Sequence, residues 1–460
     1  MKKNTNVIIQ GFGAVGASSA VNIISSNNFI NNFHVHCIDR NNKIGKEKIL
    51  EARMGQFPLS SSDKSLNNFL KKGLKKKKIS FGFNVNEFRN ADIIIVSINC
   101  DLKNFNSIEL SLFEDAIVSI LNNISENTLI LVESTVPPGT CQKIIYPQMK
   151  IIFKKRKINI NKIYLAHSFE RVTPGKNYIT SIKNSHRVYA GINNKSEIKC
   201  KDFLSKIINV KKYPLTKLKN ITSSETCKLM ENTYRALNIA FIDEWVKFSN
   251  QLNLNLFDII NAIKKRKTHN NIMLPGLGVG GYCLTKDPLF AKISQKQIHK
   301  KISTNFPLST KAIELNQRMP NTSMDFIKSH YKKNFNNKKV LFFGVSYKNE
   351  IGDIRHSPSL TLIKKFIVKK SKCFYFDPFV NELDIKNIKK IDKLSDLQNY
   401  DIIIFCVDHL KFRKFDLDKL KIKKNSFIFD LNNVLTANQT FKIKNKKLTF
   451  FSLGRDIIKN

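Results

Sequence analysis

The stretch Asn6-Val-Ile-Ile-Gln10-Gly11-Phe-Gly13-Ala-Val-Gly16 decides the fold of the first part of this chain. A short apolar run leads directly into three glycines with the spacing G-x-G-x-x-G, and the small residues at 17–25 predict a helix. Gly11 permits a tight turn, Gly13 lets a pyrophosphate approach the backbone, and Gly16 allows close packing of helix and strand. The glycine pattern alone is weak evidence, so its place between a predicted strand and a predicted helix carries the interpretation.

A second predicted strand, residues 33–39, ends at Asp39, 23 residues after Gly16. A carboxylate there accepts hydrogen bonds from ribose hydroxyls and repels a 2′-phosphate, which favours NAD over NADP. The adjacent Arg40 weakens that preference a little. The expected cofactor-binding residues of this segment are Gly11, Gly13, Val15, Gly16 and Asp39. The alternative is a glycine turn that binds no cofactor.

The same alternation of strand and helix occurs twice in the chain. Short apolar runs at 91–97 and 128–133 indicate a parallel sheet buried on both faces. From 223 to 266 there is no Pro or Gly, and apolar residues recur at helical spacing, which predicts one or two long helices. The α/β pattern then returns, with predicted strands at 339–344, 373–377, 401–406 and 427–430. We therefore expect an α/β protein with two Rossmann-like parallel-sheet domains flanking a helical middle.

Composition narrows the class of protein. The 460 residues suit two or three domains, and the net charge of +42 raises the possibility of a nucleic-acid binder. The lysines are dispersed and no recognition helix or zinc-finger spacing is present, so we interpret the charge as solvated surface that also attracts an anionic substrate. None of the eight cysteines forms a CxxC pair, and Cys37 and Cys406 are expected in the core. We expect no metal, no secretory signal, no membrane span and a reducing cytoplasmic setting.

The segment Gly278-Val-Gly280-Gly281-Tyr-Cys283-Leu-Thr-Lys286-Asp287 carries the strongest chemical signal. Its glycines allow a tight bend and the close approach of a ligand, and an ammonium near Cys283 favours the nucleophilic thiolate. The alternative is a loop cysteine without chemistry. Lys228 and Asn232 are four residues apart on a predicted helix and share one face, which by itself is weak evidence for a site.

In their order, these motifs resemble the UDP-glucose/GDP-mannose dehydrogenase family over nearly the whole chain. Four further motifs add to the glycine turn and the cysteine loop. They are Glu133-Ser-Thr135-Val-Pro-Pro-Gly-Thr140, Phe169-Glu170-Arg171-Val-Thr-Pro-Gly175, Lys228…Asn232 and Gly344-Val-Ser-Tyr-Lys348-Asn-Glu-Ile-Gly-Asp353-Ile-Arg355-His-Ser357-Pro358. The resemblance implies an NAD-binding domain at 1–214, a helical dimerisation domain at 215–325 and a UDP-sugar-binding domain at 326–460. It also implies at least a homodimer.

The resemblance further implies a mechanism. A sugar C6 alcohol is oxidised to the aldehyde, Cys283 adds to it as a thiohemiacetal, a second hydride transfer gives a thioester, and water releases the carboxylate. Such uronic acids are surface-polysaccharide precursors. The implied catalytic residues are Cys283, Lys228, Asn232, Asp287, Thr135 and Glu170. Thr135, Lys286 and Arg355 match positions that contact NAD. The implied substrate-binding residues are Glu170, Arg171, Lys228, Asn232, Gly276, Gly280 and Lys348.

Three departures from the family bear on these roles. Ile98-Asn99-Cys100-Asp101 replaces a common Val-Pro-Thr-Pro, which puts backbone contacts to NAD there in question. Pro174 stands where the UDP-glucose branch commonly has a carboxylate, so the motif looks more like the branch acting on UDP-N-acetylhexosamines. Thr285 replaces a frequent proline, with little expected effect.

Two other functions stay open from the residues alone. A two-electron hydroxyacid dehydrogenase would share the glycine turn and the helical middle, but it needs no cysteine nucleophile. A non-catalytic NAD- or UDP-sugar-binding protein would be expected to lack Cys283, Lys228 or Asp287.

Overall fold

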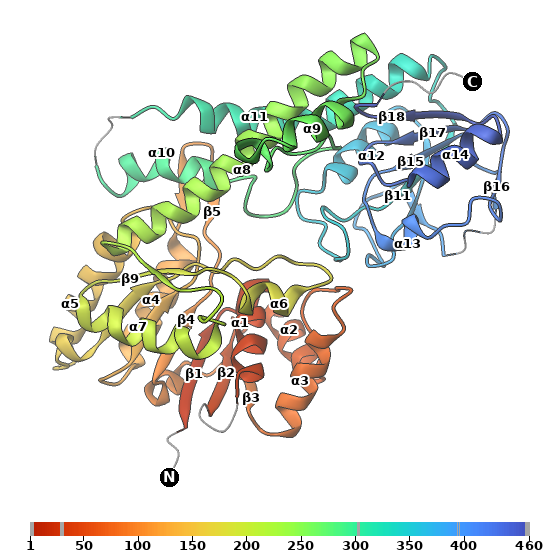
Figure 1. Ribbon diagram of the computed structural model, residues 1–460. Helices are drawn as coiled ribbons and strands as arrows, with labels where there is room; N and C mark the ends of the chain where they lie inside the picture. The colour runs from red at the N-terminus through yellow and green to blue at the C-terminus, as the bar shows by residue number, and fades with distance from the viewer. Residues whose placement is uncertain (1–3, 28–31, 301–303, 393, 395, 456–460) are drawn as a thin grey trace. The chain divides into compact units, whose positions relative to one another are not determined.

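The computed structural model describes residues 4–27, 32–300, 304–392, 394 and 396–455 (Figure 1). The chain divides into two compact units. The first comprises Met1–Glu231 and Leu289–Phe306, and the second comprises Asn232–Pro288 and Pro307–Asn460. Among the described helices, none has both the length and the apolar character needed to cross a membrane.

The first unit is built on an eight-stranded sheet, counted within the described residues, in the order β10-β9-β8-β7-β4-β1-β2-β3. Its strands are β1 (Thr5–Gln10), β2 (Phe33–Ile38), β3 (Ile79–Gly82), β4 (Ile93–Val96), β7 (Leu129–Val132), β8 (Tyr164–His167), β9 (Val188–Gly191) and β10 (Thr216–Lys217). All neighbours pair in parallel except β8 and β9. Every residue of β4 and β7 is buried, as both faces of the sheet are covered.

Helices cover this sheet on its two faces. They are α1 (Ala14–Ser25), α2 (Lys43–Arg53), α3 (Ser65–Lys75), α4 (Ser111–Asn123), α5 (Tyr146–Lys155), α6 (Tyr178–Lys183) and α7 (Asn194–Ile207). Helix α1 packs against α3 and α6, and α4 packs against α5. A β-hairpin, β5 (Asp101–Asn104) and β6 (Ser107–Glu109), follows β4; Gln297 exchanges hydrogen bonds of 3.0 and 2.9 Å with the backbone of Ile108.

The middle of the chain is helical. Its helices are α8 (Ile221–Leu252), α9 (Leu256–Lys264), α10 (Asp287–Gln297) and α11 (Pro307–His330). With 32 and 24 residues, α8 and α11 are the longest of the described helices. The helical stretch predicted at 223–266 is thus two helices. The break between them follows Asn253, which adopts a left-handed conformation with φ 54°, and Asn255 caps the start of α9.

The second unit contains a six-stranded parallel sheet, counted within the described residues, in the order β13-β12-β11-β15-β17-β18. Its strands are β11 (Lys339–Phe343), β12 (Lys372–Phe376), β13 (Ile388–Lys390), β15 (Ile402–Phe405), β17 (Phe427–Asp430) and β18 (Thr449–Ser452), with β14 (Asp396–Leu397) and β16 (Lys421–Ile422) paired apart from it. Its helices are α12 (Pro358–Val368), α13 (Leu410–Arg413) and α14 (Ala437–Asn445). Alternate residues of β11 and β15 enter two different hydrophobic clusters, so both faces of this sheet are buried as well.

The predicted fold class is therefore confirmed: one largely parallel sheet precedes the helical segment in the sequence, and one parallel sheet follows it. The predicted strands occur within one or two residues of their expected ends. The first helix begins at Ala14, earlier than expected, because Gly13 rather than Gly16 is its N-cap. Cys37 and Cys406 are core residues, as predicted, with exposed fractions of 0% and 2%.

Candidate active site

The glycine turn after β1 has the geometry that a pyrophosphate needs. Gly11 adopts φ +97°, and a Cβ there would lie 2.4 Å from the carbonyl oxygen of Ser97. A Cβ on Gly16 would lie 2.0 Å from the Gly11 carbonyl oxygen, whereas one on Gly13 would meet no atom of the described chain within 4 Å. Of the three glycines, only Gly13 therefore faces open space, and this is the position that the diphosphate has to approach. No side chain caps the N-terminus of α1 in the described structure, so its N–H groups face that space.

Asp39 lies beside this turn, immediately after β2. Its Oδ2 accepts the N–H of Phe12 at 3.1 Å and lies 3.6 Å from Nζ of Lys48, while its Oδ1 accepts the N–H of Arg40 at 2.7 Å. The side chain is 11% exposed, so an edge of the carboxylate stays accessible to a ribose. Val15 lies in the first turn of α1. These residues fit a dinucleotide of the NAD type.

A buried ion pair that sequence reasoning missed joins Glu133, which follows β7, to Arg187, which precedes β9. Nη2 of Arg187 lies 2.8 Å from Oε1 of Glu133 and 2.7 Å from the carbonyl oxygen of Ser168, and both charged side chains are 1% exposed. Oγ of Ser19 donates to Oε2 of Glu133 at 2.5 Å. The pair therefore fixes the segments that lead to Thr135 and to Glu170. No local pattern could reveal it, because Arg187 lies 54 residues from Glu133.

Glu170 is the most perturbed carboxyl group of the predicted site. It is 5% exposed, and no hydrogen-bond donor among the described residues reaches its Oε1. Burial raises the pKa of Glu170 to about 8, although Arg187 and Lys228 oppose the shift. Nζ of Lys228 donates to the Glu170 carbonyl oxygen at 3.2 Å and lies 5.1 Å from the centre of the Phe169 ring. Glu170 is thus protonated near neutral pH and can exchange a proton.

The cysteine loop leads directly into the N-terminus of α10. Cys283 is exposed, and its carbonyl oxygen accepts the N–H groups of Lys286 at 3.2 Å and Asp287 at 2.9 Å, which begins α10. The N–H of Gly281 donates to the Arg355 carbonyl oxygen at 2.9 Å, and a Cβ on Gly280 or Gly281 would lie 2.6 Å from Tyr347. The glycines are therefore required for the close packing of this loop on residues 347–358.

Behind the loop lies a buried carboxylate with two partners. Asp287 has an exposed fraction of 0%; its Oδ2 accepts from Nδ2 of Asn232 at 2.7 Å and its Oδ1 accepts from Nζ of Lys286 at 2.9 Å. Nζ of Lys286 also lies 4.5 Å from the centre of the Tyr282 ring. The structure thus brings together Asn232, Lys286 and Asp287, which are far apart or merely adjacent in the sequence. An ion pair this deeply buried is costly unless both partners are held by further contacts.

The loop after β11 carries the remaining predicted residues. Lys348 is half-buried, and burial, followed by the like charge of Arg235, lowers the pKa of its ammonium. Two cations in close proximity favour an anionic ligand. Arg355 forms an ion pair with Asp353 at 2.5 Å and lies 5.3 Å from the centre of the Tyr282 ring.

The other two predicted substrate-binding residues, Arg171 and Gly276, each have close contacts within the protein. Arg171 pairs with Glu231 at 2.9 Å and also donates to the carbonyl oxygen of His186. A Cβ on Gly276 would lie 2.6 Å from Oδ1 of Asn432, which accounts for glycine at that position.

A parallel sheet with an open glycine turn and an acidic residue after its second strand defines a dinucleotide-binding fold. Three domain models of the UDP-glucose/GDP-mannose dehydrogenase family match the chain: the NAD binding domain at residues 5–209, the central domain at 222–318 and the UDP binding domain at 341–437. The chain is 32% identical over 456 residues to a UDP-N-acetyl-D-mannosamine dehydrogenase of Methanococcus vannielii, covering 96% of this chain and 97% of that one. The chain therefore belongs to this family, and its cofactor is NAD.

The chain is also similar to two further proteins. A UDP-glucose 6-dehydrogenase of Rickettsia conorii is 25% identical over 419 residues, covering 89% of this chain and 91% of that one. The solved UDP-N-acetyl-mannosamine dehydrogenase of Staphylococcus aureus superimposes with a TM-score of 0.78 at 24% identity over 98% of both chains, which shows the shared fold. The chain is thus an oxidoreductase of the NAD-dependent UDP-sugar dehydrogenase family.

Proposed function

We propose that this protein oxidises the C6 alcohol of a UDP-sugar to the carboxylate in two steps, using Cys283 as the nucleophile. The observation that carries the proposal is an exposed cysteine, between a glycine bend and a helix N-terminus, with the buried Asn232–Asp287–Lys286 group directly behind it. A simple alcohol oxidation needs no such thiol. Bound NAD+ supplies the hydride acceptor for each of the two oxidations.

The residues divide the chemistry among them. Lys228 and Asn232 stabilise the negative charge that develops on the C6 oxygen. The Cys283 thiolate adds to the aldehyde, and the resulting thiohemiacetal loses hydride to become a thioester. Water then attacks the thioester carbon, the C–S bond breaks, and the thiol is regenerated with the carboxylate and a proton. Asp287 positions this water.

Other predicted residues hold the two ligands. Thr135 and Glu170 order water at the reacting carbon, and Glu170, being protonated near neutral pH, relays a proton. Lys286 and Arg355 contact NAD in addition to the glycine turn. Gly276, Gly280, Arg171 and Lys348 hold the UDP-sugar, with Lys348 as a countercharge for the pyrophosphate. The assigned domains are 1–214 for NAD, 215–325 for dimerisation and 326–460 for the UDP-sugar.

A UDP-N-acetylhexosamine is the proposed substrate, with UDP-glucose as the alternative. The sequence Glu170-Arg171-Val-Thr-Pro174-Gly175 supports a UDP-N-acetylhexosamine. The relative from Methanococcus vannielii is named a UDP-N-acetyl-D-mannosamine dehydrogenase, which also supports it. We further propose that the product serves surface-polysaccharide synthesis in the cytoplasm.

The same protein is proposed to work as a homodimer or a larger homo-oligomer. Helix α8 exposes an aromatic row, Phe241, Trp245 and Phe248, whose side chains are 48%, 46% and 48% exposed and whose rings contact edge to face. Large adjacent aromatics rarely stay in water on a monomer, so a second copy of this helix is their proposed cover.

The test is the stoichiometry of NADH formation with purified protein and separate UDP-sugars. About two NADH per sugar consumed are expected from a four-electron oxidation with one donor. One NADH per sugar would reduce the reaction to a simple alcohol oxidation. Cys283→Ser is expected to lose at least about 1000-fold in overall turnover while still binding NAD; full activity of this variant would disprove the covalent steps.

A further inference from the structure

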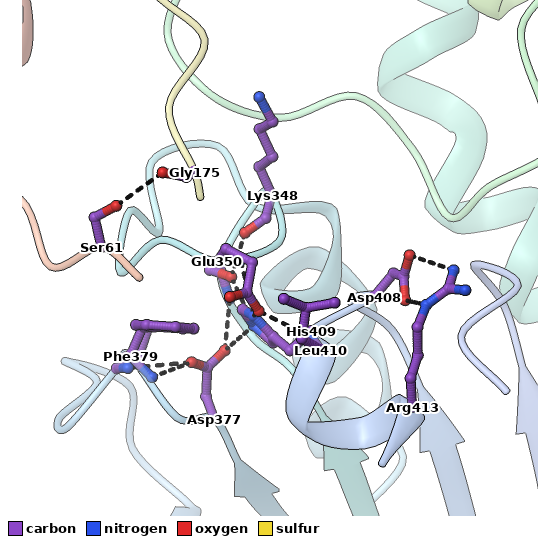
Figure 2. Close-up of polar contacts among 12 residues, drawn as sticks. Ser61, Gly175, Lys348, Glu350, Asp377, Phe379, Asp408, His409, Leu410 and Arg413 are labelled. Carbon is purple, nitrogen blue, oxygen red and sulfur yellow. Dashed lines mark hydrogen bonds and ion pairs between the residues drawn. The ribbon is translucent and has the colours of Figure 1, made fainter. Parts of the chain in front are cut away.

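A buried polar cluster in the second unit, His409 with Asp377, Glu350 and Ser346, takes no part in the proposed chemistry (Figure 2). His409 is 0% exposed and is the N-cap residue of α13. Asp377 follows the end of β12, and Ser346 and Glu350 lie in the loop that follows β11. The cluster therefore joins three segments that are distant in the sequence.

The hydrogen bonds define the form of the His409 ring. The backbone N–H of Glu350 donates to Nδ1 at 3.0 Å, so Nδ1 is an acceptor and carries no proton. The opposite nitrogen, Nε2, lies 3.3 Å from both Oδ2 of Asp377 and Oγ of Ser346, and it therefore carries the proton. The ring is neutral in this arrangement.

The charged groups around the ring are the carboxylates of Asp377 and Glu350. Oε1 of Glu350 lies 3.7 Å from Nδ1 and accepts the N–H of Leu410 at 2.9 Å. The rings of Phe379 and Phe412 cover His409 at centroid distances of 5.2 and 5.3 Å. On its own segment, Asp408 and Arg413 form an ion pair with each other.

The loop that this cluster holds is the one that presents Lys348. Oγ of Ser346 donates to the Lys348 carbonyl oxygen at 2.8 Å, and the N–H groups of Val345 and Ser346 donate to Oδ2 of Asp377 at 2.8 and 3.2 Å. The side chain of Lys348 extends away from the cluster (Figure 2). Hydrogen bonds from the cluster thus hold the backbone on both sides of Lys348.

Glu350 shows that this anchoring opposes local strain. Its φ is 64°, in the left-handed region that a residue with a long side chain seldom adopts. The N–H that donates to His409 belongs to this residue. Without the acceptor at Nδ1, the loop would gain by returning Glu350 to a common conformation, and Lys348 would move with it.

We propose that neutral His409 is a positioning residue for UDP-sugar binding, which holds the 344–350 loop so that Lys348 meets the pyrophosphate. The inference rests on the proposed function, because it assigns Lys348 to that ligand. His409 itself touches neither the ligand nor the reacting atoms.

The arrangement makes UDP affinity depend on pH. A proton on Nδ1 removes the acceptor for the Glu350 N–H. Burial alone lowers the pKa of His409, but Asp377 and Glu350 outweigh it and raise the pKa above its ordinary value. The ring therefore takes up a proton at a higher pH than an ordinary histidine does, and the affinity for UDP falls as the pH is lowered through that raised pKa.

The experiment is calorimetric titration of the full-length protein with UDP and, separately, with NAD, at about pH 9, an alkaline pH that favours the neutral ring. His409→Gln can still donate to Asp377 but has no acceptor at the Nδ1 position, and it is expected to weaken UDP binding about 10-fold with NAD binding unchanged. His409→Asn places its amide oxygen near the Nδ1 position and is expected to stay within about threefold of the wild type. Asp408→Asn, next in the chain, is the control.

A second readout separates positioning from mere stability. Lowering the pH from about 9 to about 6 is expected to reduce the UDP affinity of the wild type more than that of His409→Asn, whose side chain does not titrate. Taking the ratio of the two proteins cancels the ionisation of UDP itself. Equal UDP affinities for the wild type and His409→Gln, or parallel pH profiles, would overturn the positioning role alone. A wild type that binds no UDP would overturn the proposed substrate class together with it.

Discussion

The two glycine turns of this protein are built alike and used differently. Gly11 after β1 and Gly344 after β11 have φ of +97° and +89°, and a Cβ on either would lie 2.4 Å from the segment after the neighbouring strand, at Ser97 or Val407. Both turns precede a strand that leads to an aspartate, Asp39 or Asp377. The six strands around each turn also follow the same order, 3-2-1-4-5-6.

The two aspartates differ in what they leave free. Asp39 accepts two backbone N–H groups and remains 11% exposed. Asp377 accepts the N–H groups of Val345, Ser346, Phe379 and Val380 as well as Nε2 of His409, and its side chain is 0% exposed. The accessible carboxylate of Asp39 can accept hydrogen bonds from a ribose. The carboxylate of Asp377 is buried and occupied by protein donors, so it holds a loop instead of a ligand. The position of an aspartate in the motif thus predicts its place in the fold. Whether it can bind a ligand depends on how much of its carboxylate stays accessible.

The largest expected effects are on stability, and they test whether the two glycine turns have the same backbone requirements. Gly11→Ala and Gly344→Ala should each lower the free energy of unfolding by about 3 kcal/mol or more, because each adds a clashing Cβ at a positive φ. Gly13→Ala, whose Cβ meets no atom of the described chain, is the matched control and should leave the stability unchanged. Chemical denaturation measures all three; a tolerated Gly344→Ala would break the comparison.

The next largest expected effect is a difference between the two aspartates in their contribution to stability. Asp377→Asn is expected to lower the free energy of unfolding by about 2–4 kcal/mol, because it turns an acceptor of five donors into a partial donor. Although burial opposes it, hydrogen bonding to His409 and to backbone amides lowers the pKa of Asp377 below 3.8, so this stabilisation is present above that pH and is lost as the pH falls through the depressed pKa. Asp39→Asn should change stability by less than about 0.5 kcal/mol. Thermal unfolding of both variants across acidic pH checks the contrast.

Effects of intermediate size are expected on cofactor binding at the first glycine turn. Asp39→Asn should shift the ratio of kcat/KM for NADP over NAD by about 10-fold towards NADP, because the repulsion of the 2′-phosphate is removed. Gly13→Ala should raise the KM for NAD about 10-fold, because its methyl group enters the space that the pyrophosphate needs. Steady-state kinetics with both cofactors provides the measurement, and a wild type that is already faster with NADP would contradict the role of Asp39.

The smallest expected effect sharpens the contrast between buried carboxyl groups. Glu170 has fewer donors than Asp377, with none among the described residues at its Oε1, and burial raises its pKa to about 8. The pH profile of kcat should show an ionisation near that value in the wild type and not in Glu170→Gln. Because the folded pKa is raised, Glu170 costs stability once the unfolded side chain ionises, so Glu170→Gln should unfold at a higher temperature at neutral pH and at the same temperature at about pH 4. A variant that keeps the ionisation assigns it to another group.

The sequence predicted those features that depend on local signals. The glycine turn, the buried strands and the cysteine loop each show within about ten residues, because backbone conformation and strand burial constrain neighbouring positions. The ion pair of Arg187 with Glu133 and the cluster of His409 with Asp377 could not be predicted, since they join segments 54 and 32 residues apart. The helical spacing of Phe241, Trp245 and Phe248 predicted a helix correctly but gave no sign that these rings lie on the surface. Periodicity identifies a face and leaves its partner undefined.

The distribution of the cysteines has a practical consequence. All eight lie in the described part of the chain, and among them only Cys283 is exposed, with Cys227 intermediate and the others buried. A brief alkylation of the folded protein should therefore add one label, at Cys283, before any other thiol reacts. Peptide mapping of that label would count reactive centres per chain, and protection by bound ligand would report occupancy directly, without turnover. The protein thus carries its own chemical handle for screening substrates whose oxidation is too slow to follow.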